Sequence, residues 1–194
     1  MPATAAYNGF SPVKTLDGTP IGTIREYRCP DDTAAIGVGD MVTMTAGKAT
    51  KVAVTPIPAT ASSWPIGVVV GVKYTTPTAL GAQEMHGQYL PASASTAGYT
   101  NMWVKVIDNP DAIFKIQADG AVTSASIGLN AAVGGFTPSS TTGRSGMNLT
   151  ASTIASTSTL AVRIVDVVDP TAAYPHCHVI INPAVHMHRL ATGK

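Results

Sequence analysis

Four of the five histidines and one of the two cysteines lie in a short C-terminal stretch, PHCHVIINPAVHMH, residues 175–188. Imidazole and thiolate are common metal ligands, so this clustering raises the question of a metal site and of an enzyme built around it. In a strand, His176 and His178 would point to one face and Cys177 to the other, which leaves only two ligands on one face. A cupin-like centre would also need a Glu a few residues after the His-x-His pair, and no Glu follows Glu84.

The second histidine pair, His186 and His188, follows Asn182-Pro183. A two-residue hairpin turn at Asn182-Pro183 would place the two pairs on opposite faces, and Pro cannot adopt the positive φ that such a turn requires. We therefore expect the tail to continue in an extended conformation, with polar-face or interface histidines and no bound metal or other cofactor. A His-dependent metal protein is a less favoured alternative, and it requires four side chains to converge: His176, His178, His186 and His188.

Other catalytic patterns are weak. GRSGM, residues 143–147, resembles a G-x-S-x-G nucleophile elbow, but Met147 replaces the last Gly and no strand-turn-helix surrounds it, so we interpret it as a turn. The glutamates, Glu26 and Glu84, offer few candidates for a general acid. We expect no catalytic residues and no enzymatic activity. Six aspartates lie beside predicted turns, where Asp is favoured for structural reasons: Asp31, Asp32, Asp40, Asp108, Asp111 and Asp119.

Composition excludes several partners. Charged residues make up 12% of the 194 residues, and the net charge of +1 comes without a basic cluster, so we expect no nucleic-acid partner. No stretch approaches about 18 uninterrupted apolar residues and the N-terminus lacks a signal-peptide pattern, so we expect a soluble protein with no membrane partner. Cys29 and Cys177 are too far apart to indicate a disulfide framework, and we interpret them as ordinary thiols.

The chain is predicted to be all-β, as a small barrel or a jelly-roll-like β-sandwich, because Pro and Gly punctuate runs rich in Val, Ile and Thr. Gly67 and Gly71 indicate a bulge or a close backbone approach within one of the predicted strands. The expected elements are a hairpin over 39–54 turning at Ala46-Gly47, a strand over 64–76, a hairpin over 102–120 turning at Asn109-Pro110-Asp111, and a strand over 160–169.

Residues 1–22 contain three prolines, two Asn/Asp-Gly dipeptides and few apolar residues, which predicts an extended N-terminal arm that could reach across a neighbour. Residues 23–194 would form the β domain. If this domain has two β subdomains, they divide near residues 90–100, in a loop rich in Ser, Thr and Gly.

The order of these segments resembles the capsid decoration, or cement, proteins of tailed bacteriophages, over most of residues 23–186. The best marker is VIDNPDAIFKIQ, residues 106–117, which is followed by the TGRSGMNL segment and the RIVDVV strand. The chain departs from the pattern in its longer His-rich end and in PTAAYPHCH before the last strand.

The resemblance implies a structural protein on the outer surface of an icosahedral phage head, a virion location, and the major capsid protein as partner. It also implies a homo-oligomer, with a trimer favoured over a dimer. A carbohydrate-binding β-sandwich is the alternative, with four aromatic side chains as candidate platforms: Trp64, Trp103, Tyr89 and Tyr99.

Overall fold

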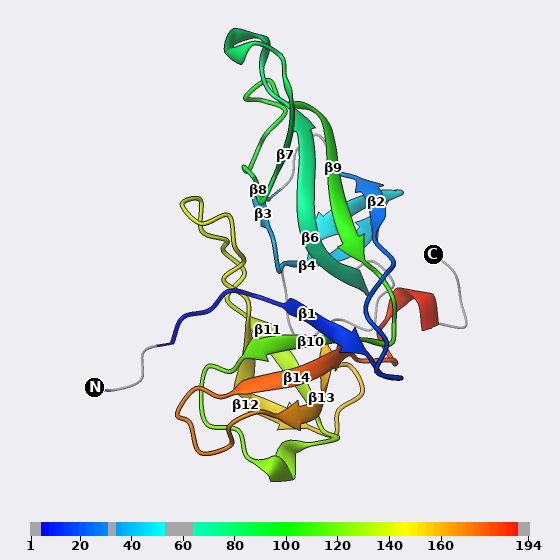
Figure 1. Ribbon diagram of the computed structural model, residues 1–194, viewed down its shortest axis with the longest axis vertical. Helices are drawn as coiled ribbons and strands as arrows, with labels where there is room; N and C mark the ends of the chain where they lie inside the picture. The colour runs from blue at the N-terminus through cyan, green and yellow to red at the C-terminus, as the bar shows by residue number, and fades with distance from the viewer. Residues whose placement is uncertain (1–4, 31–33, 53–63, 190–194) are drawn as a thin grey trace.

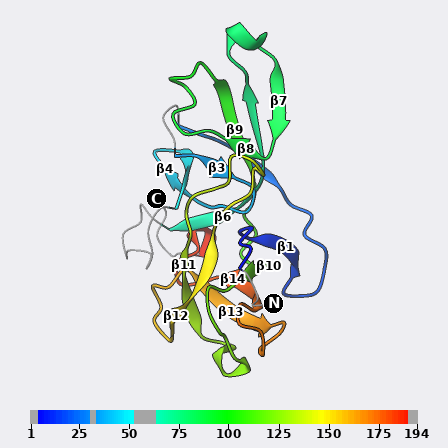
Figure 2. The same cartoon turned by 90° about the vertical axis from the view of Figure 1, so that its left-hand side faces the viewer.

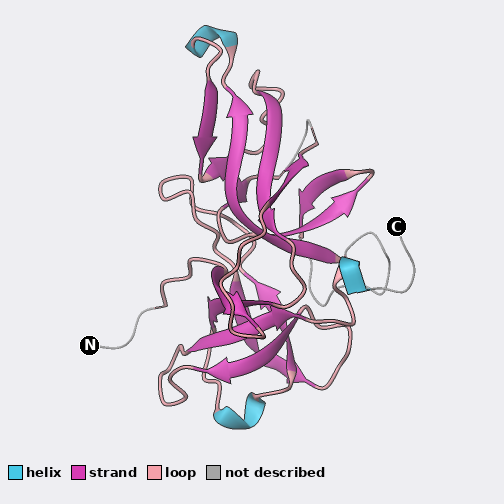
Figure 3. Ribbon diagram, turned by 45° about the vertical axis from the view of Figure 1, so that its right-hand side comes forward, coloured by secondary structure: helices cyan, strands magenta, loops and turns pink. Residues whose placement is uncertain are grey.

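The computed structural model describes residues 5–30, 34–52 and 64–189. The protein is all-β, as predicted, with two six-stranded sheets and one two-stranded sheet of antiparallel strands in an elongated body (Figure 1). Within the described residues neither large sheet closes on itself, so the fold is of the sandwich type and not a closed barrel. None of the described helices is long and apolar enough to cross a membrane. The described helices are short 3-10 turns (Figure 3): η2 (Thr78–Leu80), η3 (Ser124–Ser126) and η4 (Met187–Arg189).

The sheet in the upper half of Figure 1, here the upper sheet, has the order β2-β9-β6-β4-β5, with β7 also paired to β6. The β4–β5 hairpin turns at Ala46 and Gly47, whose φ angles of 49° and 74° are both positive, as a tight two-residue turn requires. This confirms the predicted hairpin. The strands are β2 (Arg25–Arg28), β4 (Met41–Thr45), β5 (Lys48–Lys51), β6 (Pro65–Thr75), β7 (Glu84–Gly87) and β9 (Thr100–Ile107), beside the two-stranded sheet of β3 (Ile36–Gly37) and β8 (Tyr89–Leu90).

Both glycines of β6 have the roles predicted for them. A Cβ on Gly67 would lie 2.2 Å from the backbone oxygen of Ile107, so only Gly allows β6 to approach β9 this closely. The register of β6 against β9 shifts between Val69 and Gly71, which is the predicted bulge.

The lower sheet has the order β1-β10-β14-β13-β11-β12. The predicted hairpin over 102–120 is wrong in its pairing, because β9 belongs to the upper sheet and β10 to the lower. The turn itself exists: the side chain of Asn109 accepts a hydrogen bond from the backbone N–H of Asp111 at 2.9 Å, and the chain crosses between the sheets there. Both edges of each strand already have other partners, so the two strands cannot pair with one another. The lower strands are β1 (Ser11–Thr15), β10 (Ala112–Gln117), β11 (Asn130–Gly134), β12 (Asn148–Ala155), β13 (Val162–Val167) and β14 (His176–Ile181).

The predicted N-terminal arm is largely part of the folded body. Residues 11–15 form β1, the edge strand of the lower sheet beside β10. Phe10 is only 2% exposed and packs edge-to-face on Phe114, with the ring centroids 6.0 Å apart. The arm boundary at residue 22 is therefore corrected: Phe10 and β1 are packed, and it is the mostly exposed residues 16–24 that connect the two sheets.

The two sheets share one hydrophobic core. Met41, Val68 and Ile107 of the upper sheet pack in the same buried cluster as residues from β10–β14 of the lower sheet. A second cluster lies within the upper sheet, around Val69 and Val104. The chain passes from the upper sheet to the lower sheet at residues 108–111, and not near 90–100. β1 comes before the upper strands in the sequence but belongs to the lower sheet.

Candidate functional site

The histidines of β14 are placed as the strand periodicity predicts. Cys177 is fully buried, while His176 and His178 lie on the opposite, more exposed face. The ring nitrogen Nδ1 of His178 lies 3.4 Å from a carboxylate oxygen of Asp166 on β13. Cys29 is also buried, and both thiols are free. Burial raises the pKa of Cys177 to about 11, so this thiol is protonated at neutral pH.

The expectation that the tail runs on extended is wrong. The backbone N–H groups of Val185 and His186 both donate to the carbonyl oxygen of Asn182, at 2.9 and 3.0 Å, so the chain turns there. Pro183 takes the second position of this turn, where its fixed φ is favoured. The side chain of Asn182 is buried and donates to the carbonyls of Ser158 and Leu160, which anchors the turn.

The four histidines consequently fall into two separate pairs. His176 and His178 lie at the beginning of β14, whereas His186 and His188 follow the turn beyond its end. Among residues 5–30, 34–52 and 64–189, no three potential metal-ligating side chains come together.

The turn brings His188 to the buried carboxylate of Asp108. Asp108 is 2% exposed, and its Oδ2 accepts a hydrogen bond from the Tyr27 hydroxyl at 2.5 Å and forms an ion pair with the Arg25 guanidinium at 3.1 Å. The Nε2 atom of His188 lies 3.3 Å from the same oxygen. We name these four residues the Asp108 tie, because they join β2, the sheet crossover and the C-terminal turn.

Arg25, Asp108 and His188 of the Asp108 tie line a half-open cavity of about 280 Å³, together with Thr23, Asn109 and Pro110. Burial and the hydrogen bond to Asp108 raise the pKa of Tyr27 to about 12, so Tyr27 remains a donor at neutral pH. An Asp–His pair can orient a histidine for nucleophilic catalysis. In the described part of the chain, however, no hydroxyl or thiol hydrogen-bonds to His188, and the arrangement connects three segments without presenting a nucleophile.

His186 is the most unusual titratable group of the tail. Its side chain is fully buried, its Nδ1 accepts from the N–H of His188 at 3.2 Å, and its Nε2 has no partner among the described residues. Burial lowers the pKa of His186 to about 4, so the ring is neutral at neutral pH. The sequence does not distinguish this histidine from the other three.

GRSGM directly follows a turn at residues 140–142 and does not itself form the predicted turn, because Arg144 pairs with Val38 in an isolated β-bridge. Gly143 has a φ of 70°, Ser145 is 1% exposed, and the Ser145 hydroxyl accepts the backbone N–H of Met147 at 3.0 Å. Because the Ser145 hydroxyl is buried and already hydrogen-bonded to the backbone, it is not in a position to act as a nucleophile.

Most of the acidic residues have structural partners. Asp40 is fully buried, with its Oδ2 2.8 Å from the N–H of Gly37 and 3.6 Å from the Lys51 ammonium. Burial raises the pKa of Asp40 and lowers the pKa of Lys51. The remaining acidic candidates lie as follows: Asp111 pairs with Arg189, Asp119 accepts the N–H of Ala151, Glu26 pairs with Lys105, Glu84 pairs with Lys73, and Asp31 and Asp32 lie outside the described residues.

The four aromatic candidates are all half-buried. Tyr99 packs edge-to-face against Tyr74, with a centroid distance of 5.3 Å, so the Tyr99 ring already contacts another side chain of the protein. Trp64 packs against the shared core, and Trp103 lies opposite Lys73 in the β6–β9 pairing.

Comparison with models of protein families, with curated proteins and with solved structures gives no match to this chain. Its function is therefore inferred from its own residues.

Proposed function

We propose that the protein binds the outer surface of an icosahedral phage head as a decoration protein, with the major capsid protein as its partner. The observation that carries this proposal is a group of exposed apolar side chains near the N-terminus. Val13, Leu16 and Ile24 are 43%, 50% and 54% exposed. They are three of the seven large apolar side chains that are exposed among the described residues, and all three fall within residues 13–24.

These side chains are held on ordered backbone. The register of β1 shifts between Pro12 and Lys14, which leaves Val13 at a bulge, and the N–H of Leu16 donates to the carbonyl of Asp111 at 2.9 Å. Ile24 directly precedes β2 and the Asp108 tie. Figure 2 shows the connection from β1 to β2 running along one side of the molecule, from the lower sheet to the upper. Exposed apolar residues on a fixed backbone favour docking, because little conformational entropy is lost on binding.

The composition suits a close contact with another protein. Only 12% of the residues are charged. A contact made mainly by apolar and small polar side chains depends little on salt concentration, because screening acts on charges. A homo-oligomer, which we propose to be a trimer, would present several copies of residues 13–24 at once and would strengthen a weak single contact through effective concentration.

The test is co-sedimentation with emptied heads of the phage that encodes the chain, with free capsid subunits measured in parallel. The test variant is Val13→Ser/Leu16→Ser/Ile24→Ser, and the matched control is Ile127→Ser/Val168→Ser, which removes exposed apolar side chains elsewhere. Deletion of residues 1–22 is unsuitable, because it removes Phe10 and β1 from the fold.

We expect the native protein to bind heads and not free subunits. The test variant should dissociate at least about tenfold faster, because each apolar side chain buried in a contact contributes on the order of 1–2 kcal/mol. The control should dissociate at the native rate. No binding to heads, or equal binding to free subunits, would overturn the proposal.

A further inference from the structure

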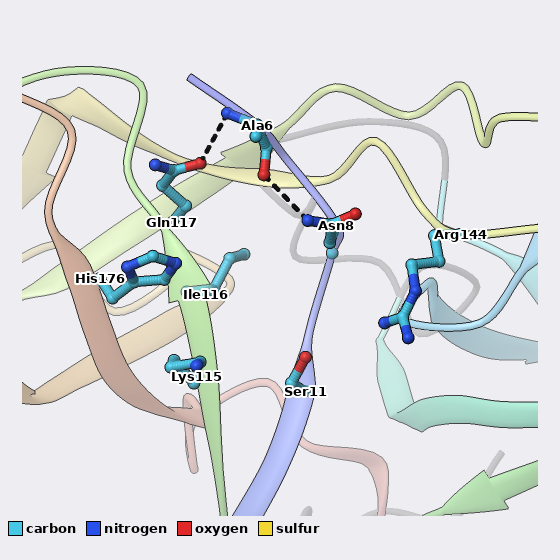
Figure 4. Close-up of a pocket in the computed structure, with 9 residues that line it drawn as sticks. Ala6, Asn8, Ser11, Lys115, Ile116, Gln117, Arg144 and His176 are labelled. Atoms are coloured by element: carbon cyan, nitrogen blue, oxygen red, sulfur yellow. Dashed lines mark hydrogen bonds between the residues drawn. The ribbon is translucent and has the colours of Figure 1, made fainter. Parts of the chain in front are cut away.

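A second cavity, of about 140 Å³, lies outside the Asp108 tie, between the N-terminal segment and the lower sheet (Figure 4). Residues 6–11 form one side, β10 and the first residue of β14 form another, and the loop at Arg144 forms a third. Its polar side chains come from Asn8, Ser11, Lys115, Gln117, Arg144 and His176.

The lining of this pocket is basic and contains no carboxylate. Lys115, Arg144 and His176 line it, and neither Asp nor Glu does. Within the described residues, the side chains of Lys115 and Arg144 form no ion pair or hydrogen bond. Five other basic side chains are paired with carboxylates: Arg25, Lys51, Lys73, Lys105 and Arg189. In a chain with so few charges, two unpaired cations on one cavity indicate a site for an anion.

The N-terminal wall of the pocket is fixed in place. The N–H of Ala6 donates to the side-chain oxygen of Gln117 at 3.0 Å, and the N–H of Phe10 donates to the carbonyl of Gly39 at 3.0 Å. A Cβ on Gly9 would lie 2.4 Å from the Cβ of Ser145, so this stretch of backbone is in close contact with the neighbouring loop. The pocket is therefore formed before any ligand binds.

We propose that this pocket binds a carboxylate presented by the partner surface, namely an acidic side chain of the major capsid protein, an inference that rests on the proposed function. A guanidinium and an ammonium bind an oxyanion through charge-assisted hydrogen bonds, and the amide of Asn8 and the hydroxyl of Ser11 can donate to the same group. The pocket adjoins the proposed contact, because Ser11 and the exposed Val13 belong to the same strand, β1. Free phosphate shares this chemistry and is the second possible source of the anion.

His176 provides a spectroscopic reporter for the pocket. Burial and the positive charge of Lys115 lower the pKa of His176. An anion bound in the pocket beside Lys115 would offset its positive charge and raise the pKa of His176. His86 on β7 does not line the pocket and serves as an internal reference.

The first measurement is an NMR titration of the histidine rings at constant ionic strength, in chloride alone, with N-acetylglutamate, and with inorganic phosphate. The pocket variant is Lys115→Gln/Arg144→Gln. Its control is Lys105→Gln/Arg28→Gln, which removes the same charge from side chains that lie outside both the pocket and the contact residues 13–24. We expect N-acetylglutamate at saturation to raise the pKa of His176 by about 1 in the native and control proteins, and not in the pocket variant.

The second measurement is the affinity of the same three proteins for emptied heads. We expect a loss of about tenfold or more in the pocket variant and little change in the control. An unchanged pKa of His176 together with unchanged head affinity would overturn the inference. A response to phosphate alone, with head affinity unchanged, would overturn the assignment of the anion to the capsid protein. If no form binds heads while the pKa of His176 still rises, the proposed function fails and the oxyanion pocket stands.

Discussion

The buried His186 shows how a single residue can make the stability of this protein depend on pH. Its ring is enclosed, and its Nε2 has no hydrogen-bond partner among the described residues. A protonated ring in this enclosed site would lack the hydration that it has in the unfolded chain, so protonation is disfavoured in the folded protein. Burial is the main cause of its lowered pKa, and the positive charges of His188 and Arg189 add to it, whereas the carboxylate of Asp108 opposes it.

We expect acidification to destabilise the native protein through His186. The pKa of this group is 6.5 in the unfolded reference and about 4 in the folded protein. Between these pH values the unfolded chain binds a proton that the folded protein does not, so the free energy of unfolding falls as the pH falls. The contribution of His186 that is present at neutral pH and lost by pH 4 is about 3 kcal/mol.

The measurement is urea unfolding at several pH values for the native protein and for His186→Gln, which keeps a polar side chain that does not titrate. Three other groups act in this range: the lowered pKa values of His176 and Glu84 have the same sign, and the raised pKa of Asp40 has the opposite sign. All three are present in the variant and cancel in the difference. A difference in unfolding free energy that stays constant from pH 7 to pH 4 would contradict the prediction.

At the scale of the elements, β6 depends on glycine at one position and not at another. A Cβ at position 67 meets the backbone oxygen of Ile107 at 2.2 Å, whereas a Cβ at position 71 has its nearest contact at 3.6 Å, with the Lys105 side chain. We expect Gly67→Ala to destabilise the protein by about 2–4 kcal/mol, because the central β6–β9 pair must separate locally. Gly71→Ala, in the same strand, is the control and should change stability by less than about 1 kcal/mol. Denaturant midpoints measure both, and equal effects of the two substitutions would refute the steric explanation.

The sequence predicted local features of these elements well. The alternation of faces in β14, the turn at Ala46-Gly47 and the roles of Gly67 and Gly71 depend on neighbouring residues, so periodicity and turn chemistry are sufficient to predict them. The all-β class followed from the same local patterns.

Features that depend on distant partners were not predicted. Phe10 belongs to the segment predicted to be an extended arm, and the ring it contacts, Phe114, lies far along the chain. The turn at Asn182 depends on the carbonyls of Ser158 and Leu160, which no local pattern reveals.

The candidate sites were missed for the same reason. The Asp108 tie combines Arg25, Tyr27, Asp108 and His188, and its geometry exists only after the two sheets and the tail have come together. The charged lining of the second pocket likewise combines residues that are separated in the sequence: Lys115, Arg144 and His176.

At the scale of the whole molecule, the shared core decides whether the two sheets behave as one unit. Met41 of the upper sheet is 1% exposed, and its N–H points to the sulfur of Met147, with the two atoms 3.3 Å apart. Both residues belong to the cluster that also contains Phe114 and Val179 of the lower sheet. Exposing either sheet alone would therefore expose apolar surface of the other.

We accordingly predict a single cooperative unfolding transition for the isolated protein. In calorimetry the van't Hoff and calorimetric enthalpies should agree, as they do for a two-state domain. Met41→Ala should cost about 2–5 kcal/mol and shift the whole transition to lower temperature, because the cavity lies in the core that both sheets share. Hydrogen exchange adds a local measurement: the amides of Val104 in the upper sheet and Val179 in the lower sheet should lose protection together in this variant. Two separate transitions, with Met41→Ala lowering only one of them, would instead establish two independent subdomains divided at the 108–111 crossover.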